Sequence, residues 1–502
     1  MKTEEFLLTI SSTVVMFVLF FFGVRWFWSS AKKSETVSLI KILYGIFFGT
    51  PQVILESMEL FLDTCEPTPA TAWILFNRLV IIGEPEDLQI VLNNPNCLQK
   101  NFMYDFLKNA LREGIFSAPV EKWRKHRRII NPAFNNRVLE GFFGIFNDKT
   151  NNLLIKLEEV ANTDKYFDLW DYISPVALDV ICQTTMGYNI NSMESSKKEF
   201  EESLLRISVA NSKRIYRPWL HPNFIFNIYA RCIGLHKNCD DLLKLPKQVI
   251  KQKQIDHRER KLKSENNINN DKYSRSFLDI LLDLNEEGAE FSDNDLLDEV
   301  LTMMIGGSET SAVTISGTLL MLAIHPEIQE KVYTEIKEIL KDNKSDDIRV
   351  EDVNQMVYLE QCIKETLRMF PVGPFLARLA MKDIPLSNGF VIRTGDNIVI
   401  PPLKVHRHSK IYKNPLIWNP ENFSEEEVAK RHKYSFIAFS GGPRGCIGGK
   451  HAMYSMKVSL SMILRKYILT TDVKLEDIKL VVDLLLRSAS GYKVKMYSRN
   501  KN

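Results

Sequence analysis

The residues best suited to chemistry lie in a glycine-rich segment around one cysteine, Phe439 to Lys450, which reads FSGGPRGCIGGK. A P-loop is excluded because Arg444 stands where its first glycine is required and His451 replaces its serine or threonine. A nucleophilic cysteine is an alternative, but no local protease signature surrounds Cys446. The pattern F-x-x-G-x-R-x-C-x-G matches at every fixed position, namely Phe439, Gly442, Arg444, Cys446 and Gly448.

This pattern resembles the haem-binding loop of the cytochrome P450 family, in which a cysteine thiolate ligates the iron. Four further family patterns follow in the family's order: Trp123-x-x-x-Arg127, the run Gly306 to Ser311, the E-x-x-R pair Glu365 and Arg368, and Pro420 to Phe423. E-x-x-R alone is weak, so the order and spacing of the set carry the resemblance. The stretches HPEIQEKVYTEI and KWRKHRRIINPAF look most like the microsomal family-4 group, especially its insect members.

The resemblance implies how haem would be held. Cys446 would be the metal ligand and Phe439 would pack beside its sulfur, while the glycines let backbone N–H groups approach the thiolate. Arginine and tryptophan donors suit the two haem propionates. The positions that match the family's propionate-binding residues are Arg444, Trp123, Arg127 and Arg378. For the tryptophan, a purely structural place in the core is the alternative.

On the other side of the haem, Glu309 and Thr310 match the family's catalytic acid–alcohol pair, which relays protons. Gly306 and Gly307 precede them, and each costs about 1 kcal/mol relative to alanine inside a helix. Either close approach of a flat ligand or a tight helix crossing can explain them. The resemblance favours the first explanation, with the helix opened over the haem for oxygen.

Two positions depart from the family pattern. Gly306 stands where many family-4 members carry a glutamate that bonds covalently to haem, so we expect haem b (iron protoporphyrin IX) to be held noncovalently. The same absence weakens the assignment to fatty-acid ω-hydroxylation. Asn422 stands where an arginine normally completes a network with Glu365 and Arg368, which we expect to form a buried structural pair.

The elements that must position these residues are mostly helical. Apolar spacing of three and four predicts helices, and short β-branched runs predict strands. The longest helix starts at a capping box, Ser292 with Asp295, and ends at His325-Pro326. We expect a loop over Asp256 to Ser276 because it lacks large apolar residues. The fold class is therefore mainly α with small β-sheets, and the resemblance implies the cytochrome P450 fold. The expected helices are Val138–Val160, Ile173–Met186, Phe200–Ala210, Phe277–Leu284, Asp293–Ile324, Pro326–Leu340 and Tyr358–Phe370, and the expected strands are Leu79–Ile82, Phe390–Ile392 and Asn397–Ile400.

The N-terminal segment is the least like a soluble protein. Phe6 to Val24 is uncharged for nineteen residues, enough to cross a hydrocarbon core of roughly 30 Å as a helix. A cleaved signal peptide is the alternative, but no small-residue cleavage site follows. We therefore expect a membrane anchor over residues 1–34 and a single large haem-thiolate monooxygenase domain over residues 35–502. The flanking charges predict a single-pass protein with this domain in the cytosol. The resemblance to microsomal members implies the endoplasmic reticulum membrane.

Composition limits the partners. The 502 residues carry a net charge of only +3, so no global basic bias indicates nucleic acid. Seven cysteines without C-x-x-C spacing argue against zinc and disulfide frameworks. The basic run Lys122, Arg124, Lys125 and Arg128 is either a solvated helix face or a docking surface for an acidic reductase.

The resemblance implies a monooxygenase that oxidises a lipophilic substrate with O2. Its electrons would come from NADPH-cytochrome P450 reductase, with cytochrome b5 as a second candidate donor. A haem-thiolate isomerase or peroxygenase is the alternative enzyme, and a haem-binding or ligand-binding membrane protein is the non-catalytic alternative.

Overall fold

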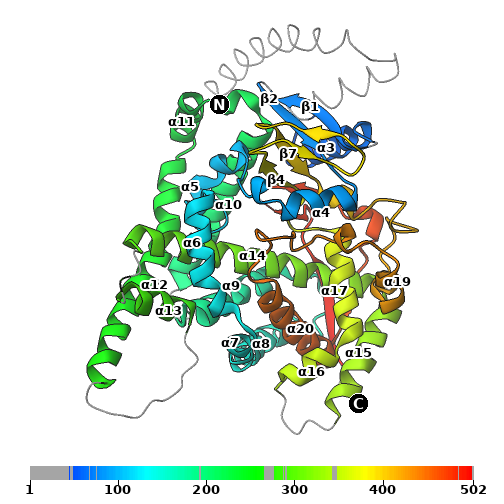
Figure 1. The fold of residues 1–502 in the computed structure, drawn as a ribbon. Coiled ribbons are helices and arrows are strands. Elements are labelled where there is room, and N and C mark those ends of the chain that lie inside the picture. The colour runs from blue at the N-terminus through cyan, green and yellow to red at the C-terminus, as the bar shows by residue number, and fades with distance from the viewer. Residues whose placement is uncertain are drawn as a thin grey trace.

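Helices carry most of the structure, with small sheets at the edges, as the sequence predicts (Figure 1). The computed structural model describes residues 45, 49–66, 68–74, 76–190, 194–264, 276–286, 288, 291–341, 347–483 and 485–499. The described helices are α3 (Pro51–Thr64), α4 (Pro85–Asn93), α5 (Lys108–Leu111), α6 (Val120–Ile130), α7 (Asn136–Glu140), α8 (Phe143–Glu158), α9 (Trp170–Met186), α10 (Glu194–Tyr216), α11 (Asn223–Cys232), α12 (Leu235–Ser264), α13 (Phe277–Glu286), α14 (Asp293–Ile324), α15 (Pro326–Leu340), α16 (Val350–Gln355), α17 (Val357–Met369), α18 (Pro402–Val405), α19 (Glu425–Ala429) and α20 (Gly449–Lys466).

The largest sheet has four strands in the order β1-β2-β7-β4, and it lies beside α3 in Figure 1. The β1–β2 and β7–β4 pairs are antiparallel, whereas β2 and β7 are parallel. The strands are β1 (Ala70–Ile74), β2 (Asn77–Ile81), β3 (Phe167–Asp168), β4 (Leu376–Leu379), β5 (Ile384–Pro385), β6 (Val391–Ile392), β7 (Asn397–Ile400), β8 (Tyr467–Thr470), β9 (Leu480–Val482), β10 (Leu486–Ser488) and β11 (Lys493–Ser498).

Helix α14 crosses the middle of the molecule (Figure 1). It has the predicted bounds, and both halves of the capping box between Ser292 and Asp295 are formed. At 1.5 Å per residue its 32 residues extend about 48 Å. Most of its side chains are buried, so this one helix can present groups to the interior along the width of the fold.

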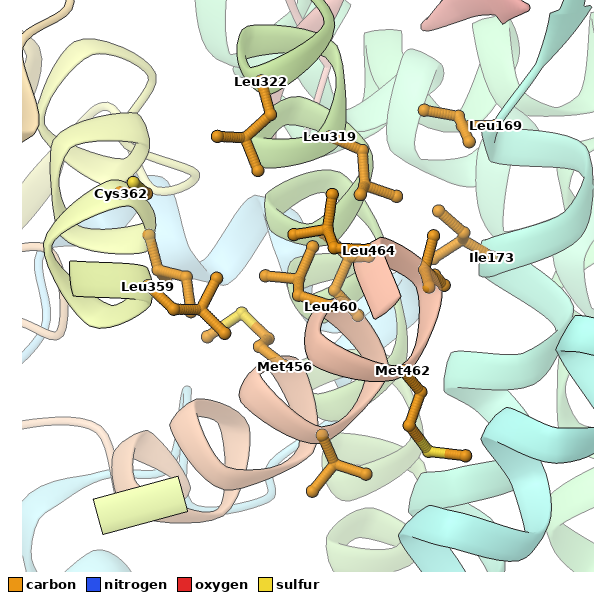
Figure 2. Close-up of a cluster of buried hydrophobic side chains, with 14 of the residues drawn as sticks. Leu169, Ile173, Leu319, Leu322, Leu359, Cys362, Met456, Leu460, Met462 and Leu464 are labelled. Carbon is orange, nitrogen blue, oxygen red and sulfur yellow. The ribbon is translucent and has the colours of Figure 1, made fainter. Parts of the chain in front are cut away.

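Helix α20, which begins directly after the cysteine loop, is held in the centre of the core. Figure 2 shows Met456, Leu460 and Leu464 of α20 between side chains of three neighbouring segments, among them Leu319 of α14 and Leu359 of α17. Burial of a leucine or methionine side chain stabilises the fold by about 1.5–3 kcal/mol. The start of α20, and with it the cysteine loop, is therefore fixed by apolar packing.

Several predicted boundaries differ from the structure; the helix expected over Phe200–Ala210, for example, is six residues longer at each end (α10). The helix expected over Val138–Val160 is two helices, because the chain turns at Gly141 and Phe142 between α7 and α8. The loop expected from Asp256 begins too early, since α12 continues to Ser264. Polar side chains near the end of α12 bind acids of α13. Nε2 of His257, for example, lies 2.7 Å from Oδ1 of Asp283. The sequence predicts a loop because this segment lacks large apolar residues. Charged contacts with α13 stabilise the helix in their place.

The anchor predicted over residues 1–34 lies outside the described residues. Within the described part of the chain, no single helix is long and apolar enough to cross a membrane. The bent pair α14 and α15, with 114° between its two helices, passes that test by length and composition.

Candidate functional site

The cysteine loop, Phe439 to Gly448, is a set of tight turns directly before α20. The N–H of Cys446 donates to the carbonyl oxygen of Phe439 at 2.9 Å, and the N–H of Gly445 donates to that of Gly442 at 2.9 Å. Gly442 has φ +64°, and a Cβ there would lie 2.0 Å from the carbonyl oxygen of Leu92. Glycine is therefore required at 442 by both backbone conformation and space.

The thiol of Cys446 faces a large internal cavity of about 1100 Å³. Its exposed surface opens into this cavity. Burial raises the pKa of the Cys446 thiol, while the N–H of Gly448, which donates to the sulfur, and the charge of Arg127 lower it. The loop thus supplies the N–H donor and the nearby cation that a thiolate needs.

The four side chains predicted to hold propionates, Trp123, Arg127, Arg378 and Arg444, all line this cavity. The guanidinium of Arg444 lies 4.3 Å from the ring of Trp123. It also donates to the carbonyl oxygens of Leu98 and Ala118, at 3.1 and 2.8 Å. Burial, and then the charge of Arg378, lower the pKa of Arg444 to about 9. These cations are crowded together, which favours binding of an anion between them.

Lys100 belongs to the same group and was not predicted. It is buried and lines the cavity, with Nζ 4.2 Å from the ring centre of Tyr104. Among the described residues no carboxylate pairs with it, and burial, Arg378 and Arg444 together hold its pKa well below the usual value. Neither a motif nor a spacing in the sequence connects Lys100 with Arg444, so only the folded chain could reveal it.

Helix α14 also borders the cavity, with Gly306, Gly307 and Thr310 among the lining residues. The helix continues through both glycines without interruption, so the expected opening does not break it. The hydroxyl of Thr310 donates to the carbonyl oxygen of Gly306 at 2.8 Å. A Cβ on Gly306 would meet nothing within 4 Å, whereas one on Gly307 would lie 2.4 Å from Cδ1 of Ile181 in α9. Cavity space thus explains Gly306, and a tight helix crossing explains Gly307.

Glu309 does not line the cavity with Thr310. Its carboxyl lies close enough to Arg487, Glu201 and Asp483 to feel their charges. Burial, opposed by Arg487 and reinforced by the two acids, raises its pKa to about 7. A carboxyl with this pKa exchanges protons readily near neutral pH.

A sequence profile described as "Cytochrome P450" matches residues 43–496. The chain belongs to the cytochrome P450 family. Among its relatives, cytochrome P450 4c21 of Blattella germanica is 35% identical over 437 residues, 86% of each chain. Human cytochrome P450 4V2 is 33% identical over 442 residues, 85% of this P450 and 82% of the relative. The chain is therefore a family-4-like cytochrome P450 monooxygenase with a haem-iron cofactor, and the mainly helical fold is the P450 fold.

The residues present fit haem. The thiol of Cys446, with an N–H donor beside it, opens into a cavity wide enough for a flat ligand, and cations that pair with no carboxylate among the described residues also line it. Ligation of the iron needs the thiol, and binding of the propionates needs the cations. Cys446 would hold the iron, and Arg127, Arg378, Arg444, Trp123 and Lys100 would hold the propionates.

Behind the site, this P450 carries a rearranged polar network. Glu365 and Arg368 are fully buried and form the predicted pair through two hydrogen bonds of 2.7 and 2.8 Å. Nδ2 of Asn422 donates to Glu365 at 3.0 Å. Arg431 lies beside this network: it donates to the backbone carbonyl oxygen of Asn422 and lies over the ring of Tyr412, 4.6 Å from its centre. Among the described contacts it does not pair with Glu365, so the amide of Asn422 takes the place of the usual arginine without its charge.

One member of the basic run on α6 is not available at the surface of this P450. Lys122 is bound by Asp295 at 2.7 Å and by Asp298 at 3.1 Å, so it ties α6 to α14. His126 reinforces this link through Glu299, at 2.7 Å. Because these acids engage Lys122, it is a weaker docking candidate than its exposed neighbours, and the docking surface itself stays a prediction. Arg124, Lys125 and Arg128 are exposed.

Proposed function

We propose that this P450 is a membrane-bound monooxygenase that oxidises a lipophilic substrate with O2 and electrons from NADPH-cytochrome P450 reductase, with cytochrome b5 as a second electron donor. The observation that carries the proposal is that the thiol of Cys446 and the hydroxyl of Thr310 face one cavity whose walls are mostly apolar. An apolar cavity with a few convergent polar groups is typical of small-molecule sites. We place the protein in the endoplasmic reticulum membrane.

Each site residue has a defined task in this proposal. Haem iron, when bound, supplies the activation of dioxygen. Cys446 ligates the iron, and Phe439 packs beside the sulfur. Thr310 holds a proton on its hydroxyl at the cavity wall, and Glu309 delivers protons from the polar side of α14. The apolar wall excludes water from the reacting groups.

We infer that haem b is held noncovalently. Gly306 has no side chain to form an ester with the haem, although the space beside it is open. Extraction with acidified acetone should remove all haem from the polypeptide. Haem that stays with the polypeptide would contradict this inference.

Exposed aromatic residues support contact with a membrane. Trp73 and Phe76, in and beside β1, are 60% and 88% exposed, and Phe224 of α11 is 70% exposed. The β1–β2 pair and α11 lie at the same end of the molecule in Figure 1. Trp73 and Phe76 also line the cavity, so a lipophilic substrate could enter from the bilayer. Large exposed apolar side chains gathered in one region are typical of membrane or protein contacts.

The basic residues that remain exposed on α6 support docking of an acidic reductase. Arg124, Lys125 and Arg128 precede or follow the cavity residues Trp123 and Arg127 on the same helix. Steering between opposite charges raises association rates and weakens as salt increases. Reversing Arg124 and Arg128 to glutamate should slow electron transfer at low salt and remove most of its salt dependence. Retention of that dependence would indicate another docking face.

The deciding experiment combines a spectrum with turnover. The reduced carbon-monoxide complex should show the red-shifted Soret band of thiolate ligation, and Cys446→His should abolish it. Reductase-supported oxidation of a lipophilic substrate then distinguishes a monooxygenase from the alternatives. Turnover that needs peroxide or no reductase would indicate a peroxygenase or isomerase, and binding without turnover would indicate a non-catalytic protein.

A further inference from the structure

The charged side chains that line the cavity form two groups, one of cations and one around an acid. Among the described lining residues the cations are Lys100, Arg127, Arg378 and Arg444, apart from His451, whose pKa burial lowers to about 4. These cations act on one another's charges and lie on the side of Cys446 and Trp123. They are the residues assigned above to the haem propionates. Among the described lining residues, no further cation remains to pair with the carboxylate of a substrate.

The acidic side chain that lines the cavity is Asp483, between β9 and β10. Both Nε and Nη2 of Arg487 donate to the same oxygen, Oδ2 of Asp483, at 3.2 and 2.5 Å. This leaves Oδ1 outside the pair. Tyr216 lines the cavity as well and packs in one apolar cluster with Val482, the residue before Asp483. Burial, and then the charge of Asp483, raise the pKa of its hydroxyl. A hydroxyl donor and a carboxylate acceptor therefore lie near each other in an otherwise apolar wall.

Two further carboxyl groups, those of Glu309 and Glu201, lie close enough to Asp483 or to each other for their charges to interact. Glu309 feels the charges of Glu201, Asp483 and Arg487. Oε1 of Glu201 is buried without a hydrogen-bond partner. Among the charges that act on Glu309, Arg487 is thus the one cation against two acids, and it is already bound to Asp483. An anionic group brought to this wall would lose its hydration and meet an excess of negative charge, and both effects oppose binding.

We propose that the substrate is an uncharged lipophilic molecule whose polar group donates a hydrogen bond, such as an alcohol, and that the carboxylate of a free fatty acid is disfavoured. Asp483 accepts a hydrogen bond from the substrate hydroxyl and Tyr216 donates one to it, while the apolar walls hold the chain. This inference rests on the proposed function, because it assumes that the cavity receives the substrate.

The test uses ligands of one chain length: 1-dodecanol, methyl laurate and laurate. Each is titrated into the haem-loaded full chain, and binding is read from the visible spectrum and from the rise in melting temperature. Dodecanol should bind at least about tenfold more tightly than laurate, the cost of one desolvated, unpaired charge at its lower limit. Methyl laurate, which is uncharged but only accepts hydrogen bonds, should lie between them.

A variant sharpens the test. Asp483→Asn removes the negative charge and releases Arg487, so laurate should bind about tenfold more tightly than it does to the unmodified protein. Asp477→Asn, which changes an exposed acid in the same C-terminal region, is the matched control and should change neither affinity. If Asp483→Asn fails to bind haem, the comparison of ligands on the unmodified protein still decides.

The proposal is overturned if laurate binds the unmodified protein as tightly as dodecanol, or if neither uncharged ligand binds. It is also overturned if a folded Asp483→Asn variant leaves laurate binding unchanged. Failure of the monooxygenase function would look different: dodecanol would bind, but the reductase and NADPH would not support its oxidation.

Discussion

The neighbouring glycines of α14 allow a sharp test, because a methyl group added to each meets different surroundings. Replacing either glycine by alanine should gain about 1 kcal/mol of helix propensity. At Gly306 no protein atom opposes this gain, since the added Cβ meets none within 4 Å and points into cavity space. At Gly307 the Cβ would lie 2.4 and 2.5 Å from Cδ1 and Cγ1 of Ile181. Overpacking of this kind costs about 1–3 kcal/mol, so Gly307→Ala should be less stable than Gly306→Ala by that amount.

The assay is a thermal melt of both haem-loaded variants at one scan rate. Unfolding entropy of about 2 cal/mol/K per residue gives about 1 kcal/mol/K for this chain, so the melting temperatures should differ by about 1–3 °C. Ile181→Ala removes the two clashing atoms, and its cost should therefore be smaller in the Gly307→Ala background than in the unmodified protein. Equal melting temperatures for the two glycine variants, or additive effects of Ile181→Ala, would refute the explanation of Gly307 as a helix crossing.

Four further outcomes are expected. Asn422→Arg should lower the melting temperature, because it adds a further cation to a network that already holds Arg368 and lies beside Arg431; Arg431→Met in the same chain should restore part of the loss, and a neutral effect of Asn422→Arg would contradict this account. Lys100→Met should speed haem transfer to apomyoglobin because it removes a propionate partner, and an unchanged transfer rate would exclude that role. Thr310→Ala should consume NADPH without a matching amount of product, and unchanged coupling would count against the proton relay. The pKa of Glu309 is raised above its unfolded value, so the folded state binds the extra proton and loses stability as pH rises towards about 7; Glu309→Gln should flatten this decline in melts between pH 5 and 8.

The sequence was most informative where local rules and long-range packing agree. Helix α14 could be bounded to the residue because its capping box, its apolar spacing and the terminal proline all lie within the segment itself. The cysteine loop could be predicted because chemistry and backbone geometry restrict Gly442 and Cys446 to one residue type each.

The missed features depend on contacts between distant segments. Lys100 is a single lysine in an unremarkable sequence, and its burial beside Arg378 and Arg444 exists only in the folded chain. Arg431 binds the backbone of Asn422 from nine residues away and lies over the ring of Tyr412, and no pattern of residue types encodes those contacts. The helical end of α12 depends likewise on acids contributed by α13.

The group of unpaired cations near Cys446 also affects how the protein is made. Before haem binds, Lys100, Arg127, Arg378 and Arg444 repel one another in a space shielded from water, and this repulsion destabilises the newly synthesised chain. Haem contributes two negative charges to that space, so its capture completes folding. The amount of soluble protein obtained from a host cell should therefore follow the supply of haem precursor during synthesis, and Lys100→Met should make the yield less dependent on that supply.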